Sequence, residues 1–160
     1  MNIIESVDLS YKENNEEIIK SVNLKVHTGD IYGLLDLYGF TKGVFVKLFS
    51  GKIKPSQGYL IIKGIDTNRK KKIKCLVSSS YKLPGSCKFF SGYACLVFYA
   101  MLYKAPKRRV DEVFELLGLL KVKNKRVSKY SLYMKKRLAL ARALLKKSEV
   151  IIIEQPTIFG

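Results

Sequence analysis

Four consecutive apolar, β-branched residues, Val150-Ile-Ile-Ile153, are the feature that most constrains the fold of this chain. Such a run is typical of a strand that is covered on both faces, as in a parallel sheet with helices on either side. The stretch Ile31-Tyr-Gly-Leu-Leu35 is a second short apolar run, and we expect it to form another buried parallel strand. Together the two runs predict an α/β fold built in layers.

Turn residues and hydrophobic periodicity divide the rest of the chain into strands and helices. Alternation and β-branched content predict strands at 2–9, 22–26, 59–62 and 73–77. Apolar residues at helical spacing predict helices over 42–50, 110–117 and 134–145, with Gly51 and Gly118 as stop signals after two of them. A doubly wound sheet needs further elements to cover its central strand, so we expect the chain to be the front part of a longer protein.

The charge balance is strongly basic. Thirty Lys and Arg residues against 13 Asp and Glu residues give a net charge of +17. Nucleotide phosphates, an acidic membrane surface and nucleic acid would all suit this excess, although spread basic residues are also typical of an ordinary solvated surface. Only six of the basic residues are Arg, and no helix-turn-helix, zinc-finger or RNA-recognition pattern occurs, so specific nucleic-acid binding is not expected.

Other features of the sequence exclude several classes of protein. The longest uncharged apolar run, 92–102, is shorter than the roughly 18 residues that a membrane-spanning helix needs. The N-terminus has no basic start followed by an apolar block, so a secretory signal is not expected. Cys75, Cys87 and Cys95 are odd in number and lack C-x-x-C spacing, which argues against a zinc finger or a disulfide scaffold and favours a reducing cytosol.

Segments along the whole chain resemble the ATP-binding cassette domain of ABC transporters, in the family's order. The P-loop, signature and Walker B positions are occupied by Gly33–Val44 (GLLDLYGFTKGV), Ser131–Arg137 (SLYMKKR) and Val150–Thr157 (VIIIEQPT). The flanks Asp8–Tyr11 (DLSY), Leu48–Gly51 (LFSG), Pro55–Gly58 (PSQG) and Leu138–Leu145 (LALARALL) agree as well. The resemblance implies an α/β, P-loop NTPase-type layered sheet with a helical subdomain, truncated after the Walker B strand. It assigns residues 1–88 and 149–160 to the α/β core and residues 89–148 to the helical subdomain.

The resemblance also implies ATP and Mg²⁺ as cofactors and gives particular residues the family's roles. The positions that would bind ATP are Tyr11, as an aromatic that stacks on adenine, Asp36, Tyr38, Gly39, Phe40, Thr41, Lys42, Gly43 and Val44 in the P-loop, and Ser131 and Tyr133 in the signature. The positions that would hold Mg²⁺ are Gly43, Ser78 and Glu154, and the catalytic positions are Glu154 and Gln155.

Several P-loop positions depart from the pattern G-x-x-x-x-G-K-[ST], in which glycines let backbone N–H groups close around phosphate. Asp36 brings a carboxylate toward the phosphates, and a positive φ at the β-branched Thr41 would cost about 1–3 kcal/mol. Gly43 has no hydroxyl for Mg²⁺. Because Lys42 and the inner Gly39 remain, a weak phosphate site and a residual turn that binds nothing both stay open.

The signature and Walker B positions depart as well. Tyr133 replaces the glycine that lets the ATP of a second subunit approach, whereas Ser131 remains and can cap the following helix. Glu154 keeps the negative charge of the expected Asp with one more methylene group. Gln155 is neutral, so it can orient a water molecule but cannot take a proton from it. We therefore expect slow or absent ATP hydrolysis.

The function that the resemblance implies is the ATP-binding subunit of a membrane exporter of the antimicrobial-peptide or drug type, cytoplasmic and at the inner face of the cell membrane. Its expected partners are a transmembrane permease subunit and a second cassette, in a head-to-tail dimer that traps ATP. Two alternatives stay open. One is a non-hydrolysing relic or regulatory cassette that only docks to a partner, and the other is a non-specific basic nucleic-acid binder.

Overall fold

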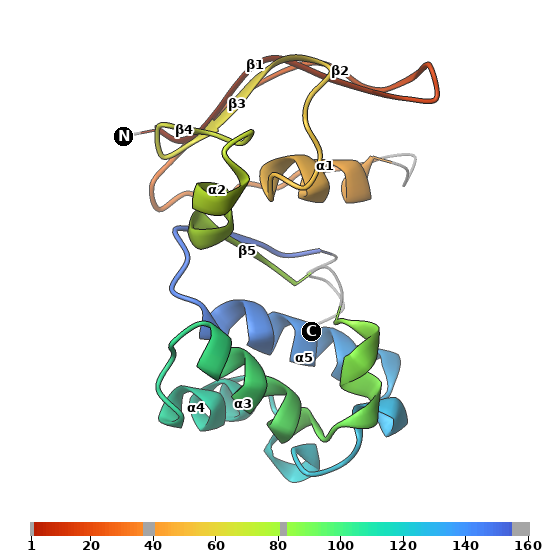
Figure 1. Cartoon of the computed structure of the whole chain (residues 1–160), viewed down its shortest axis with the longest axis vertical. Helices are drawn as coiled ribbons and strands as arrows, with labels where there is room; N and C mark the ends of the chain where they lie inside the picture. The colour runs from red at the N-terminus through yellow and green to blue at the C-terminus, as the bar shows by residue number, and fades with distance from the viewer. Residues whose placement is uncertain (1, 37–40, 81–82, 155–160) are drawn as a thin grey trace. The chain divides into compact units, whose positions relative to one another are not determined.

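The fold comes from a computed structural model that describes residues 2–36, 41–80 and 83–154. The chain divides into two compact units, residues 1–77 and 78–160, and each is described by itself. Strands and helices both occur, as the sequence predicts for an α/β protein (Figure 1). The predicted assignment of residues 1–88 and 149–160 to one core, with residues 89–148 as a helical subdomain, stays a prediction.

The first unit is built on an antiparallel sheet. Its strands are β1 (Asn2–Glu13), β2 (Glu16–His27), β3 (Gln57–Ile62) and the two-residue β4 (Ile65–Asp66), in the order β2-β1-β3-β4. Asn14 and Asn15 connect β1 to β2 with φ angles of 50° and 66°. Two consecutive positive φ angles are what a type I′ hairpin turn requires, and Asn adopts them more easily than most residues.

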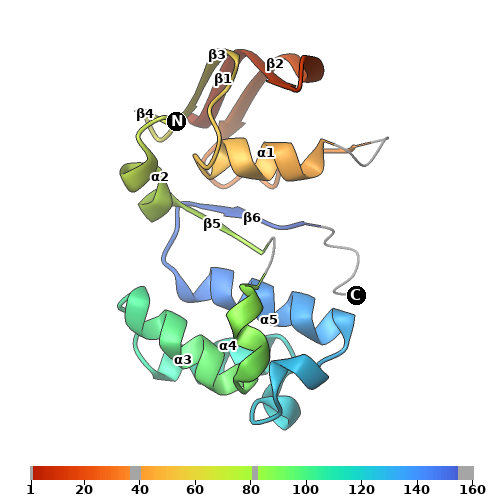
Figure 2. The same cartoon turned by 45° about the vertical axis from the view of Figure 1, so that its right-hand side comes forward.

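Helix α1 (Lys42–Phe49) lies on one face of this sheet and contacts β3 (Figure 2). The fully buried side chains of this unit include Leu48 of α1, Leu9 of β1, and Leu60 and Ile62 of β3. Gly51 follows the helix as its predicted stop, with a φ of +64°. A Cβ atom at this glycine would lie 2.8 Å from the carbonyl oxygen of Thr67, so the stop requires the residue without a side chain.

The apolar run at residues 31–35 is not the predicted strand. Residues 31–36 have no regular secondary structure, and the side chains of Ile31 and Leu35 are fully exposed. Apolar composition indicates a preference for burial, but a strand also needs a neighbouring strand to accept and donate its backbone hydrogen bonds. Among the described residues no strand pairs with this segment.

The predicted strand at 73–77 is also wrong for most of its length. Helix α2 (Lys70–Leu76) covers it, and strand β5 (Val77–Ser79) begins only at its last residue. Ile73 is the buried residue of α2, whereas Val77, also buried, has extended backbone and already belongs to β5. The β-branched residues at the two ends suggested a strand, but the backbone is helical as far as Leu76.

The second unit is mainly helical. Its helices are α3 (Gly92–Leu102), α4 (Arg108–Leu116) and α5 (Leu132–Leu145), connected through the 3-10 turns η1 (Gly85–Phe89), η2 (Leu120–Val122) and η3 (Val127–Lys129). The three α-helices contact one another (Figure 1) and enclose an apolar core that includes Leu96, Val110, Phe114 and Leu138. The helices predicted over 110–117 and 134–145 are confirmed within a few residues.

The run at 150–153 forms a strand, but the strand is not buried. Strand β6 (Val150–Ile152) pairs with β5 in a two-stranded sheet (Figure 2), and β5 is its only strand neighbour among the described residues. The side chains of Ile151 and Ile153 are 40% and 43% exposed. A β-branched run favours a strand, whereas its burial depends on neighbours that the run itself does not supply.

Candidate functional site

The P-loop segment meets α1 at a backbone turn that is held by a carboxylate. The Asp36 carboxylate accepts a hydrogen bond from the N–H of Thr41 at 2.9 Å, and the Thr41 carbonyl accepts from the N–H groups of Val44 and Phe45 at 3.0 Å each. The φ angle of Thr41 is −91°, so the strain that a positive φ would cause at this β-branched residue is absent. N–H groups at a helix start are the donors that a phosphate would use, and Asp36 occupies one of them.

The other P-loop positions are described only in part. Tyr38, Gly39 and Phe40 lie outside the described residues, as does the side chain of Lys42, whose backbone begins α1. Gly43 is half-buried in the first turn of that helix, where it supplies no side-chain oxygen. The chain therefore brings Asp36, Thr41 and the start of α1 together, while the role of the lysine amine stays a prediction.

Tyr11 lies near the end of β1, opposite Ile19 of β2 in the strand register. Its side chain is half-buried, so part of the ring surface remains open to solvent. Stacking on an adenine base needs an accessible aromatic face of this kind. The adenine-stacking role of Tyr11 remains a prediction.

The second unit brings the Walker B end and the segment of Ser78 together. Strands β5 and β6 pair, and the pairing continues past β5, because the N–H of Ser80 donates to the carbonyl of Ile152 at 3.0 Å. The hydroxyl of Ser80 accepts a hydrogen bond from the N–H of Glu154 at 3.2 Å. Two of the predicted Mg²⁺ positions, Ser78 and Glu154, therefore lie on neighbouring segments, whereas Gln155 lies outside the described residues.

The oxygen atoms at this place suit a magnesium ion. The Ser78 hydroxyl is buried and has no hydrogen-bond partner among the described residues. Glu154, whose side chain is half-buried, carries a carboxylate on the neighbouring segment, where its backbone N–H binds Ser80. Mg²⁺ prefers oxygen ligands and is usually held by one or two carboxylates together with phosphate oxygens. By donor chemistry Ser78 and Glu154 fit the ion and Gly43 does not, and the Mg²⁺ roles of the two residues stay predictions.

The signature segment begins α5. The Ser131 hydroxyl accepts a hydrogen bond from the N–H of Met134 at 3.2 Å, which makes it the N-cap that the sequence predicts. Tyr133 follows in the first turn with a side chain that is 60% exposed. Its expected effect on the ATP of a second subunit stays a prediction.

Arg142 is a residue of this region to which sequence reasoning gave no role. Its guanidinium donates a hydrogen bond to the carbonyl of Ser79 at 3.1 Å and lies 5.4 Å from the centre of the Tyr99 ring. It thereby links α5 to β5 and to α3. The signal was present in the sequence, because Arg142 is the one charged residue within the apolar segment 138–145.

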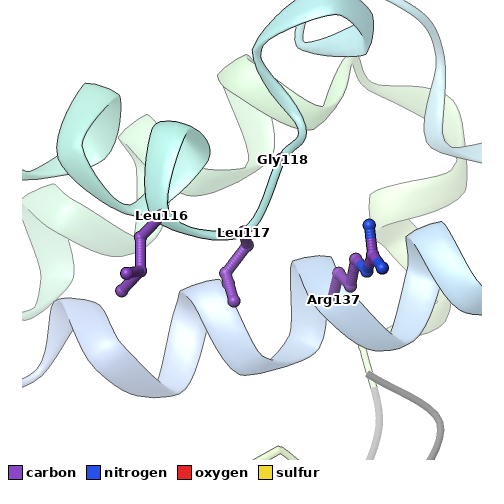
Figure 3. A pocket seen from close by; sticks show the side chains of 4 residues that line it. All are labelled: Leu116, Leu117, Gly118 and Arg137. Atoms are coloured by element: carbon purple, nitrogen blue, oxygen red, sulfur yellow. The ribbon is translucent and has the colours of Figure 1, made fainter. Parts of the chain in front are cut away.

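A shallow pocket also lies on the second unit, away from these positions. It has a volume of about 210 Å³ and is lined by Leu116, Leu117, Gly118 and Arg137, where the end of α4 faces α5 (Figure 3). Sites for small molecules usually measure about 300–1,000 Å³. None of its lining residues is a predicted site residue, so it is not the candidate site.

Comparison with known proteins places the chain among ABC transporter components. The family model described as ABC transporter matches residues 19–158. The bacitracin transport ATP-binding protein BcrA of Bacillus licheniformis is 34% identical over 157 residues, which cover 97% of this chain and 51% of that protein. The energy-coupling factor transporter ATP-binding protein EcfA2 of Clostridium perfringens is 28% identical, over 96% of this chain and 57% of that protein. The chain thus spans about half the length of the curated relatives it matches.

Solved structures agree with this fold. CbiO1 from Clostridium perfringens, part of the ABC transporter complex cbiONQ, superposes with a TM-score of 0.79 at 27% identity, covering 98% of this chain and 66% of that one. An ATP-binding subunit of an ABC transporter superposes with a TM-score of 0.83 at 19% identity, over 98% of this chain and 68% of that one. The predicted P-loop NTPase-type fold with a helical part is confirmed.

Proposed function

The chain belongs to the ABC transporter family of ATP-binding proteins, and we propose that it forms the nucleotide-binding part of an exporter's ATP-binding subunit, in which ATP and Mg²⁺ bind but hydrolysis is slow. One observation carries the proposal. The hydrogen bond from the N–H of Glu154 to the Ser80 hydroxyl, at 3.2 Å, holds the Walker B end beside the segment of Ser78. The oxygen donors for a nucleotide-bound cation thus lie on neighbouring segments.

The P-loop segment would hold phosphates weakly. The N–H groups at the start of α1 and the helix dipole favour an anion. By resemblance, Lys42 would add a positive charge for the phosphates. The Asp36 carboxylate already accepts a hydrogen bond from the Thr41 N–H at 2.9 Å. A phosphate oxygen that binds this N–H must displace a group of like charge, so Asp36 competes with the nucleotide.

Slow turnover follows from the residues at the Walker B end. When bound, Mg²⁺ would neutralise charge on the phosphates, and Glu154 and Ser78 are the residues that would hold it. Gln155 stands where the family has the residue that polarises the attacking water. Its amide can orient that water but has no basic site to accept the proton. Nucleotide binding and release, with little hydrolysis, is the activity that this residue set supports.

A regulatory cassette that docks without turnover is the second candidate, and Tyr133 favours it. In the family's head-to-tail dimer, the signature of one subunit meets the ATP of the other. The Tyr133 side chain is 60% exposed at the start of α5, so its ring would hold that ATP away. A dimer of this chain with a second cassette would then remain open on this side.

A transmembrane permease subunit is the proposed partner, and α3 offers a surface for it. Phe98, Met101 and Leu102 are 53%, 67% and 59% exposed and are spaced three and four residues apart, so they form one apolar stripe on the helix. By resemblance, this helical region receives a helix of the permease. No helix among the described residues is long and apolar enough to cross a membrane itself. The proposed location, by resemblance, is the inner face of the membrane, reached through the permease.

Nucleotide binding can be tested by the thermal stability of the full chain with and without Mg-ATP. Binding at 100 times the dissociation constant should add about 2.7 kcal/mol to the free energy of unfolding. We expect Lys42→Ala to weaken the affinity for Mg-ATP and Asp36→Gly to strengthen it. The gain in Asp36→Gly should be about tenfold if the lost repulsion amounts to about 1.4 kcal/mol. Asp30→Gly is the matched control, because it makes the same charge change six positions earlier in the chain.

The outcomes separate the two candidates. Saturable, Mg²⁺-dependent stabilisation that grows in Asp36→Gly and not in Asp30→Gly would support the ATP-binding subunit. If neither the unaltered chain nor Asp36→Gly is stabilised at any ATP concentration, the chain binds no nucleotide and only the docking cassette remains.

A further inference from the structure

Two sequence motifs that lie far apart in the chain, Asp8–Tyr11 and Pro55–Gly58, meet where β1 and β3 run side by side (Figure 1). Strand β3 begins at Gln57, which lies opposite Ser10 of β1 in the strand register. A Cβ atom on Gly58 would overlap backbone carbonyl oxygens of β1, so this close approach requires glycine. The second motif therefore lies directly against the backbone of the first.

Ser56 binds the backbone of β1 on both sides of Tyr11. Its N–H donates a hydrogen bond to the carbonyl of Ser10 at 2.8 Å, and its hydroxyl accepts one from the N–H of Lys12 at 2.9 Å. This carbonyl and this N–H belong to the two peptide planes that flank Tyr11. Because each peptide group is planar, holding both planes holds the backbone dihedral angles of Tyr11, and with them the direction in which its side chain leaves the strand.

The strand pairing is irregular at the same place. Between β1 and β2 the register shifts once between Leu9 and Tyr11 and again between Tyr11 and Lys12. An irregularity of this kind bends a strand, re-aims a side chain and disrupts the regular ladder of hydrogen bonds. The direction of the Tyr11 side chain therefore depends on bonds from outside that ladder, and Ser56 supplies two of them.

Contacts with β2 hold the part of β1 that precedes Tyr11. The hydroxyl of Ser10, a residue that is 4% exposed, accepts a hydrogen bond from the N–H of Ser21 at 2.9 Å. The hydroxyl of Ser21 in turn donates to the Asp8 carboxylate at 2.8 Å. These bonds act before Tyr11, whereas the Ser56 hydroxyl acts on the peptide group that follows it.

We propose that Ser56 is a positioning residue for nucleotide binding, whose hydroxyl holds the Tyr11 ring in the orientation that stacks on adenine. The inference rests on the proposed function, in which Tyr11 contacts the base. The Tyr11 side chain is half-buried, so its ring must face one way to offer its open surface to a base. A ring held in that direction beforehand loses less freedom on binding. The Ser56 hydroxyl thus affects the base of the nucleotide and not its phosphates.

The affinities of the full chain for Mg-ATP and for Mg-tripolyphosphate, measured by titration calorimetry, test this role, because only ATP carries a base. We expect Ser56→Ala to weaken the affinity for ATP about two- to tenfold, the worth of one hydrogen bond, and to leave the affinity for tripolyphosphate unchanged. Ser56→Thr keeps the hydroxyl and should bind ATP as the unaltered chain does. Ser56→Val has the shape of threonine without the hydroxyl and should behave like Ser56→Ala. Gln57→Ala is the matched control, because it shortens the exposed side chain next to Ser56 and should change neither affinity.

A double-mutant cycle shows whether Ser56 acts through Tyr11. Tyr11→Ala removes the ring, so the addition of Ser56→Ala to this variant should cost no further affinity for ATP. The inference is overturned if Ser56→Ala weakens ATP binding equally with and without the Tyr11 ring. It is also overturned if Ser56→Ala weakens the binding of tripolyphosphate as much as that of ATP.

The NMR signals of the Tyr11 ring report its orientation without any nucleotide. In a chain with isotope-labelled tyrosine rings, Tyr11→Phe identifies these signals by their loss. Ser56→Ala and Ser56→Val should shift the Tyr11 signals and leave those of the other tyrosines in place, and Ser56→Thr should restore them. A general loss of structure would move the signals of many tyrosines, so this measurement separates positioning from a change in stability.

The inference and the proposed function can fail separately. If the unaltered chain binds neither Mg-ATP nor Mg-tripolyphosphate, the proposed function fails, and adenine fails with it as the ligand of Tyr11. If ATP binds but neither its affinity nor the Tyr11 signals change in Ser56→Ala and Ser56→Val, the inference fails and the proposed function stands. Unmoved Tyr11 signals in both variants overturn the positioning role of Ser56 whether or not a nucleotide binds.

Discussion

Gly92, the first residue of α3, stands where a side chain would collide with a buried tyrosine. The Tyr130 ring is buried, and its hydroxyl donates a hydrogen bond to the carbonyl of Val122 at 2.8 Å. Burial raises the pKa of Tyr130 to about 12, so the hydroxyl keeps this donated proton at physiological pH. A Cβ atom on Gly92 would overlap the Tyr130 hydroxyl, so Gly92→Ala forces the ring to move.

We expect Gly92→Ala to lower the free energy of unfolding by about 1–3 kcal/mol, the usual cost of overpacking a core. Helix propensity alone would favour alanine by up to about 1 kcal/mol, so a loss of stability identifies the steric contact. Urea denaturation followed by circular dichroism measures the change. Gly85→Ala is the control, because a Cβ at Gly85 meets no atom within 4 Å. Equal stability of the two variants would contradict the assignment.

The residues of the candidate site differ in how far the sequence could place them. Ser131 was predictable as a cap, because capping depends on the local order of residues. The hydrogen bond from the Thr41 N–H to the Asp36 carboxylate was not predictable, because the sequence indicated only that a carboxylate approaches the phosphate position. Arg142 was missed because its partner Ser79 is 63 positions away, and no local pattern reports such a contact.

At the scale of elements, the charges near the N-terminus of helix α5 have the sign that the helix dipole disfavours. Its first turn has no acidic residue, and Lys135, Lys136 and Arg137 follow close behind. Positive charge near a helix N-terminus is unfavourable, so the cap from Ser131 to the N–H of Met134 matters more here than in an ordinary helix.

We expect Ser131→Ala to destabilise the chain by about 1 kcal/mol, and Ser131→Thr to retain most of the stability, because threonine also caps. The midpoint of urea denaturation, compared at equal slope, measures both effects. Ser128→Ala serves as the control, because Ser128 is an exposed residue of η3 three positions earlier in the chain. This variant should change the free energy of unfolding by less than about 0.5 kcal/mol. If Ser128→Ala lowered the free energy of unfolding as much as Ser131→Ala does, the lost helix cap would not be the cause of the destabilisation.

The elements that the sequence predicted well are those whose signals are local. The helices at 42–49 and 108–116 are followed by Gly51 and Gly118, whose positive φ angles stop a helix whatever lies around it. The segments at 31–35 and 73–77 failed because pairing and burial of a strand depend on residues far along the chain.

At the scale of the whole chain, the basic charge is unevenly distributed. Residues 1–77 hold 13 basic and eight acidic residues, and residues 78–160 hold 17 and five, a net charge of +5 against +12. Residues 104–147 alone hold 15 basic and three acidic residues, and two of the acidic ones are engaged: Asp111 with Lys123 at 3.2 Å and Glu112 with Arg109 at 2.9 Å. A subunit at the inner face of a membrane would turn such a surface toward acidic lipid headgroups.

We expect the full chain to sediment with vesicles that contain phosphatidylserine and not with pure phosphatidylcholine vesicles. Each lysine near an acidic surface contributes about 1 kcal/mol, so the triple variant Lys121→Glu, Lys125→Glu and Lys129→Glu should weaken binding at least about 100-fold. The control variant Lys12→Glu, Lys25→Glu and Lys52→Glu makes the same charge change on exposed residues of the first unit. Binding should also fall steeply as salt rises, because screening shortens the reach of exposed charges to about 8 Å at physiological ionic strength.

The comparison of the two triple variants shows whether a particular basic surface or the total net charge drives vesicle binding. Loss of vesicle binding only in the variant of residues 121–129 would assign the lipid contact to the second unit. Equal loss in both variants would mean that total charge, and not a particular surface, drives the attraction. Tighter binding to RNA than to the acidic vesicles at the same salt concentration would contradict the membrane surface as the partner. Both polyanions offer phosphate groups. Only the vesicle also offers a lipid interface to the exposed side chains of Leu120 and Leu132.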